Sequence, residues 1–85
     1  MQNFPESDAL AQGHTFGEKA VGLSFNPSGD GDVHACKALL AKAIDQMNEL
    51  RAATQSPEVR RLASVAITEL QGAQMWAVKA ITWKD

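Results

Sequence analysis

The stretch from Leu62 to Ile81 constrains the fold more than any other part of the chain, because as a helix it is apolar on almost every side. Only Glu69 and Lys79 carry charge in it. A surface helix needs one apolar stripe, whereas a helix that is apolar on several sides must be covered on several sides. A chain of 85 residues forms one small domain, with one other good helix to supply that cover. The missing cover must come from other copies of the chain or from a partner, so we expect obligate assembly with functional sites between subunits.

The composition argues against several classes of function. Hydrophobic residues make up 45% of the chain, which is too many for a disordered protein. The chain has 8 basic and 10 acidic residues, and its net charge of −2 argues against binding to a nucleic-acid polymer or an anionic membrane. The run 62–81 is long enough to cross a bilayer, but its polar side chains favour burial in protein instead. The one cysteine, Cys36, rules out an internal disulfide and indicates a reduced, cytoplasmic setting.

The N-terminal part of the chain divides into a tail and an arm. Residues 1–16 are polar and lack the basic start and apolar stretch of a secretion signal, so we predict a flexible tail. Residues 17–27 partly alternate apolar and polar side chains, which predicts a short extended arm. We assign residues 17–85 to one helical-hairpin domain that oligomerises and binds the ligand.

Spacing and capping residues predict two helices joined by a short link. The first runs from about Gly31 to Ala53, with Asp30 as its N-cap. Ser56 and Pro57 begin the second, which runs to about Thr82. Because the link is short, the helices should pack antiparallel. We therefore predict an all-α fold, an antiparallel two-helix hairpin with a short extended N-terminal arm, assembled into a homo-oligomer. In the first helix, steps of three and four are typical of a coiled-coil seam at Val33, Cys36, Leu40, Ala43, Met47 and Leu50.

No set of residues has the spacing that catalysis or a metal ion requires. No nucleophile is matched with a histidine and a carboxylate. His14, His34 and Cys36 are not at metal-ligand spacing. The glycine-rich stretch 29–32 lacks the Lys-Ser/Thr pair of a phosphate-binding loop. We expect no enzyme, no cofactor and no metal.

A few cations and one aromatic residue are candidates for ligand binding. Lys37 lies one position off the predicted seam, Arg61 opens the second helix, and Lys79 lies near its end. These are either solvated surface charges or parts of a phosphate-binding pocket at a subunit edge. Phe25 is either a core residue or a platform on which a nucleobase stacks.

The second helix carries a recognisable pattern. An arginine opens it, and a Thr-x-Leu-Gln-x-x-x-Met-x-x-Val-Lys-Ala string follows. The pattern resembles the second helix of the phage anti-CBASS and anti-Thoeris sponge proteins, and the resemblance covers residues of about 20–83. The first helix is similar to that family's first helix, with Val33, Cys36 and Lys37 before an Ala/Leu-rich stretch. The sequence departs from the commoner pattern at the turn 25–29 and at Trp76. The matching residues of the second helix are Arg61, Thr68, Leu70, Gln71, Met75, Val78, Lys79 and Ala80.

The resemblance implies a non-catalytic role. Members of the family assemble as hexamers or smaller oligomers of interlocked hairpins. They bind cyclic nucleotide signals made by bacterial defence systems and keep them from their effectors. The ligands are cyclic dinucleotides, cyclic trinucleotides and cyclic ADP-ribose isomers, and the site of action is the cytoplasm of the infected or lysogenic bacterial host. The resemblance does not single out one of these ligands for this chain.

The resemblance also assigns roles to individual residues. It implies that Lys37 and Arg61 contact phosphate and that Phe25 stacks on a base. The further candidates for ligand contact are Asn26, Thr68 and Lys79. The alternative function is a phage-encoded helical interaction or adaptor module that binds another protein through the apolar face of its second helix.

Overall fold

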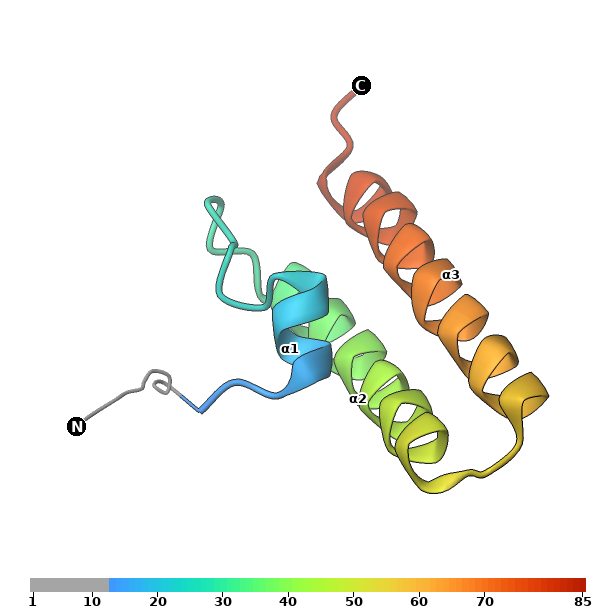
Figure 1. Ribbon diagram of the computed structural model, residues 1–85. Helices are drawn as coiled ribbons and strands as arrows, with labels where there is room; N and C mark the ends of the chain where they lie inside the picture. Colours follow the sequence, from blue (N-terminus) through green and yellow to red (C-terminus); the bar gives the residue numbers. More distant parts are fainter. Residues whose placement is uncertain (1–12) are drawn as a thin grey trace.

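The computed structural model describes residues 13–85, and over this range the regular secondary structure is entirely helical. Helix α1 spans Phe16–Val21, α2 spans Gly31–Ala53 and α3 spans Pro57–Thr82. Helices α2 and α3 form an antiparallel hairpin, and α1 packs against α2 (Figure 1). Residues 1–12 of the predicted tail lie outside the described residues.

Capping residues set the beginning of both hairpin helices. The Asp30 carboxylate accepts hydrogen bonds from the backbone N–H groups of Asp32 at 2.8 Å and Val33 at 3.4 Å. The Ser56 hydroxyl oxygen accepts one from the N–H of Val59 at 3.2 Å. These bonds satisfy donors that the first turn of a helix leaves without partners. The predicted bounds of both helices are confirmed.

The predicted extended arm over residues 17–27 is wrong in its first part, where the structure has helix α1. A capping box begins this helix. The hydroxyl oxygen of Thr15 accepts from the N–H of Glu18 at 3.1 Å, and the Glu18 carboxylate accepts from the N–H of Thr15 at 2.9 Å. Gly22 ends the helix in the left-handed region with φ of 63°. Over the described residues the fold therefore has three helices rather than two.

The alternation of apolar residues that predicted an extended segment spans the end of α1. Val21 is buried as the last residue of the helix, while Leu23 packs against the same core from the turn that follows. Phe25 comes after this turn and is exposed. A helix end followed by a turn can thus produce the spacing of two that otherwise indicates a strand.

Gly17 lets α1 approach α2 closely. A Cβ atom built on Gly17 would lie 2.0 Å from the carbonyl oxygen of Ala41, so only glycine fits. The backbone N–H of Gly17 donates to the Asp45 carboxylate at 2.6 Å. This contact closes a small core to which all three helices contribute, formed by Val21, Ala41, Ile44 and Ile67.

The buried line of α2 differs from the predicted seam. Leu50, at the end of that seam, is 44% exposed, and Lys37, predicted to lie off it, is buried. The reason is that α1 as well as α3 packs on α2, so the most buried positions lie between the two contacts. Those positions are Val33, Lys37, Ala41 and Ile44.

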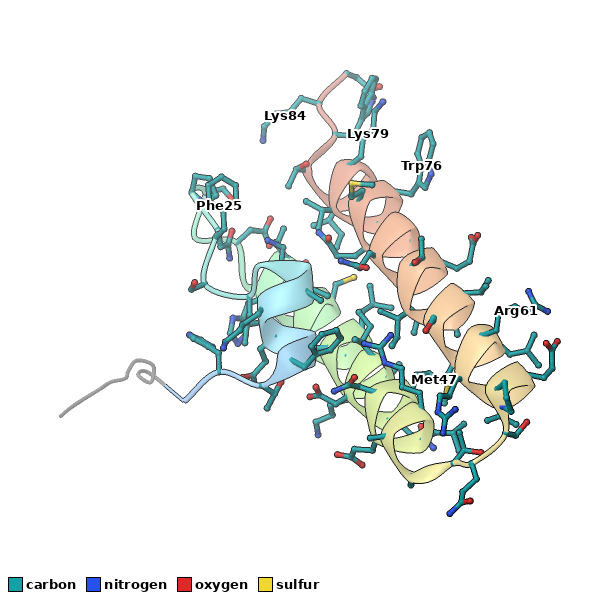
Figure 2. The ribbon with its side chains drawn as sticks, viewed as in Figure 1. Phe25, Met47, Arg61, Trp76, Lys79 and Lys84 are labelled. Atoms are coloured by element: carbon teal, nitrogen blue, oxygen red, sulfur yellow. The ribbon has the colours of Figure 1, made fainter. Side chains whose placement is uncertain are left out.

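The molecule is one helix thick. Its extents are 47 × 37 × 13 Å, and a helix with its side chains is about 10–12 Å across. Helix α3 is therefore covered by α2 on one side, and Trp76 lies on the side that faces away from α2 (Figure 2). Within residues 13–85, no helix is long and apolar enough to pass through a bilayer.

Candidate functional site

An open groove of about 480 Å³ lies where the loop before α2, the first turns of α2 and the last turns of α3 meet. Its lining is mainly apolar and includes a small number of polar groups, which is the usual composition of a small-molecule site. The lining residues are Phe25, Asn26, Pro27, Ser28, Val33, Lys37, Gln74, Met75, Val78 and Thr82.

Hydrogen bonds inside the loop fix its shape. The Asn26 side-chain amide donates to the carbonyl oxygen of Asp30 at 2.8 Å, and the Ser28 hydroxyl donates to the Asn26 amide oxygen at 3.2 Å. Gly29 adopts φ of 66°, a conformation that other residues rarely reach. Phe25 precedes this turn with 71% of its surface exposed. The loop thus presents an aromatic ring at the edge of the groove without needing to be ordered by a ligand.

Lys37 braces the base of the loop from α2. Only 4% of the residue is exposed, and its Nζ donates to the carbonyl oxygens of Gly22 at 3.0 Å and Phe25 at 2.5 Å. The same Nζ lies 5.6 Å from the centroid of the Phe25 ring, within the range of a cation–π contact. An ammonium has three protons to donate, and two are used here. Lys37 therefore holds the loop and places a positive charge in the groove wall.

Arg61 lies far from this groove within one chain. It forms a two-pronged ion pair with Glu58, with Nε–Oε1 and Nη2–Oε2 distances of 3.0 and 2.6 Å. This pairing lowers the pKa of the Glu58 carboxyl and raises the pKa of the Arg61 guanidinium. Arg61 and Lys79 occupy opposite ends of α3 (Figure 2). At 1.5 Å per residue the two positions are about 27 Å apart along the helix.

Lys79 and Thr68 also lie outside the lining of the groove. The Nζ of Lys79 is 5.6 Å from the ring centroid of Trp76 and 5.8 Å from that of Trp83, so this cation sits over two indoles. Thr68 is exposed in the middle of α3. Of the predicted site residues, the structure brings Phe25, Asn26 and Lys37 together and leaves the other three apart.

One comparison with known proteins decides the family. The family model for the Acb2/Tad1 hairpin domain matches residues 18–82, which include all of α2 and α3. The chain belongs to this family. Acb2/Tad1 proteins are phage anti-CBASS and anti-Thoeris cyclic nucleotide sponges, which are binding proteins rather than enzymes. No curated protein and no solved structure matches the chain.

The Acb2/Tad1 hairpin of this chain has groove residues that sequence reasoning did not select. Gln74, Met75, Val78 and Thr82 form the α3 wall, and the Thr82 hydroxyl donates to the carbonyl oxygen of Val78 at 2.8 Å. These positions share one side of a helix, which by itself does not show that this side faces a groove. The one signal in the sequence is that Met75 and Val78 belong to the family pattern.

A second groove of about 580 Å³ follows the contact between α2 and α3. Its lining is mostly apolar and includes few polar groups, so it has little with which to orient a charged ligand. The residues are Ala43, Gln46, Met47, Ala66, Glu69, Leu70 and Ala73. In the part of the chain that the structure describes, no three His, Cys, Asp or Glu side chains lie close enough to share a metal ion.

Proposed function

We propose that this Acb2/Tad1 hairpin protein is a non-catalytic sponge. It binds and sequesters the cyclic nucleotide second messengers of bacterial anti-phage defence, which are cyclic di- or trinucleotides or cyclic ADP-ribose isomers. Bound messenger no longer activates its effector. The protein acts in the cytoplasm of the infected or lysogenic host, as a homo-oligomer for which a hexamer is favoured.

The groove beside Phe25 and Lys37 is the observation that carries the proposal. A nucleobase offers a flat π-face, which stacks on an exposed aromatic ring. The phosphate of the same nucleotide needs a cation or N–H donors, and Lys37 supplies a positive charge at the base of the groove. Sequestration requires tight binding without chemistry, and a loop that is already ordered reduces the entropy lost on binding.

Self-association is supported by the thinness of the chain. A layer 13 Å deep leaves the large side chains of Met75 and Trp76 on α3, and of Trp83 just after it, exposed. Exposed apolar patches of this kind usually mark an interaction surface. Further copies of the chain would cover these side chains and would convert an open groove into a closed pocket between subunits.

A matched pair of variants tests the groove. Phe25 and Leu39 are equally exposed at 71%, but Leu39 lies outside the groove. We expect Phe25→Ala to weaken cyclic nucleotide binding by about 1–3 kcal/mol, the range for one stacked base, while Leu39→Ala binds as the wild type does. Titration calorimetry with cyclic di- and trinucleotides and cyclic ADP-ribose isomers measures this. Native mass spectrometry of the same mixtures gives the mass of the ligand and the number of subunits. Absence of binding across the whole panel would refute the sponge function.

The charge in the groove wall has its own test. We expect Lys37→Ala to weaken ligand binding by about 1.5–3 kcal/mol, the scale of a hydrogen bond to a charged group, without dissociating the assembly. Lys42→Ala, which removes an exposed cation of the same helix, is the control. Unchanged affinity in Lys37→Ala would remove Lys37 from the binding site.

The exposed side of α3 also favours a second candidate function. A helical adaptor would use the same apolar side chains to bind a different protein. The two functions differ in what the purified protein does alone. A chain that stays monomeric and binds no cyclic nucleotide would support the adaptor function. A stable homo-oligomer would bury this surface and would count against the adaptor function.

A further inference from the structure

The side of α3 that faces away from α2 carries a regular seam. Its residues follow one another at steps of three and four, the spacing of the contact line in a coiled coil. The buried residues Ala63 and Ile67 lie on the opposite side of the helix. Trp76 and Trp83, which are 72% and 64% exposed, dominate the seam. The outer seam of α3 consists of Leu62, Val65, Glu69, Gly72, Trp76, Lys79 and Trp83. Glu69 also lines the second groove, and Trp83 is the C-cap residue that follows the helix.

Gly72 lies in this outer seam without a reason inside the chain. Glycine is among the poorest helix formers, and it is placed in a helix interior where something must approach the backbone closely. Gly17 meets that condition, since a Cβ there would collide with Ala41. A Cβ atom at Gly72 would meet no atom of the chain within 4 Å. A bulky side chain from another molecule would account for it.

We propose that the outer seams of two copies of this chain pack antiparallel about a twofold axis that crosses the seam between Gly72 and Trp76, at the level of Gln74 along the helix. Glu69 and Lys79 lie five residues before and after Gln74, so each Glu69 faces the partner's Lys79. Gly72 and Trp76 lie two residues before and after it, so the partner's Trp76 packs on Gly72. Val65 and Trp83, nine residues before and after it, face each other in the same way.

Charge and size select this arrangement over the alternatives. A parallel pair in register would place Glu69 against Glu69 and Lys79 against Lys79, and like charges at an interface repel. Shifting the antiparallel pair by one heptad in one direction would place Glu69 opposite Gly72. Shifting it in the other direction would place Glu69 beyond the end of the seam. In neither case would Glu69 face the partner's Lys79. The proposed register joins the only acidic and the only basic residue of the outer seam and fits the largest side chain onto the smallest residue.

The pairing also relates Arg61 to the groove. Arg61 lies thirteen residues before Gln74. In the proposed pair, the partner's Arg61 is therefore level with a point just past the C-terminal end of α3 of the first chain. Along the axis of α3, that point is about 7–8 Å beyond Thr82, one of the residues that line the groove, at 1.5 Å per residue. The partner's Arg61 thereby becomes a candidate for the phosphate contact that Arg61 cannot make within its own chain. This step rests on the proposed function, whereas the pairing itself requires only self-association.

Charge reversal tests the pairing. Both Glu69 and Lys79 are exposed in the single chain, so Glu69→Lys and Lys79→Glu should each keep the helical circular dichroism of the wild type. Alone, each variant brings two like-charged pairs together, and we expect its dissociation constant for this contact to rise at least about tenfold. Mixed in equal amounts, the two variants restore both opposite-charge pairs and should recover the wild-type mass in sedimentation equilibrium. The double variant E69K/K79E should recover it alone. Glu49→Lys and Lys42→Glu, on the exposed side of α2, are the controls.

Three outcomes would overturn the pairing. The first is a wild type that is monomeric at micromolar concentration. The second is that the single charge reversals keep the wild-type mass. The third is that the wild-type mass is recovered neither by the mixture of the two variants nor by the double variant. Cyclic nucleotide binding is measured separately on the wild type. Loss of the charge rescue with intact ligand binding would refute this register alone. Charge rescue without any ligand binding would refute the sponge function and leave the register in place.

Discussion

Gly17 and Gly72 show how differently the two sides of this molecule are explained. Gly17 lies in the contact between α1 and α2, where the carbonyl oxygen of Ala41 leaves no room for a Cβ atom. Gly72 lies on the outer seam of α3, where a Cβ atom would meet nothing. The glycine on the inner side is explained by a contact within one chain. The glycine on the outer side is of the kind that a close contact requires, but no atom of the same chain approaches it. The proposed pairing of two copies would give Gly72 the kind of close contact that Gly17 has within the chain.

The largest effect is expected where the inner contact is broken. Gly17→Ala places a methyl group against the backbone of α2, and backbone cannot move aside as a side chain can. We expect the free energy of unfolding to fall by about 3 kcal/mol, the upper part of the range for an overpacked core. Urea denaturation monitored by circular dichroism measures it. A loss below about 0.5 kcal/mol would show that α1 contributes little to the stability of the hairpin.

Two lysines sharpen the same contrast. Lys37 is buried and donates to two backbone carbonyls, whereas Lys79 is exposed on the outer seam. We expect Lys37→Met to lower the free energy of unfolding by about 2 kcal/mol, since charged hydrogen bonds contribute about 1.5–3 kcal/mol. Lys79→Met should lower it by no more than about 1 kcal/mol in the dissociated chain, the scale of the exposed cation–π contacts that Lys79 makes with Trp76 and Trp83. Equal losses in urea denaturation at low protein concentration would contradict the distinction between the two sides.

Gly72→Ala should act in opposite directions on folding and on association. Alanine is a better helix former than glycine by about 1 kcal/mol, so the dissociated chain should become more stable by that amount. The added methyl group would meet the partner's Trp76, so the assembly should become weaker. Urea denaturation at low concentration and sedimentation equilibrium at high concentration separate the two effects. If Gly72→Ala is more stable than the wild type but associates equally well, the partner does not pack on Gly72.

The sequence predicted the long helices well because their signals are local. Asp30 and Ser56 mark where α2 and α3 begin, and each acts through hydrogen bonds within three residues of itself. Helix α1 was missed although Thr15 and Glu18 have the spacing of a capping box. A six-residue helix is too short for its apolar period to show, so the alternation at its end dominated the pattern.

The candidate site was predicted only in part because it depends on tertiary contacts. Phe25, Asn26 and Lys37 lie within thirteen residues of one another and meet at one end of α2. The α3 wall approaches them only after the hairpin closes, and nothing in a linear pattern states which side of α3 that will be. The burial of Lys37 was likewise unexpected, because its two acceptors are backbone carbonyls of a loop whose path depends on α1.

The smallest effect is expected at the exposed ion pair that opens α3. The hydrogen bonds from Arg61 lower the pKa of Glu58 in the folded chain. A carboxyl with a lowered folded pKa stabilises the fold above its unfolded value, and this contribution is lost as the pH falls through the folded pKa. Glu58→Gln should therefore be slightly less stable than the wild type at pH 7, and the difference should vanish at acidic pH well below 4.5. Urea denaturation at both pH values measures it. A difference that persists in acid would show that it does not depend on the charge of the Glu58 carboxylate, and would therefore count against the ion pair. A difference at pH 7 that grows with protein concentration would instead tie this end of α3 to the partner, where the proposed pairing brings Arg61 toward the groove.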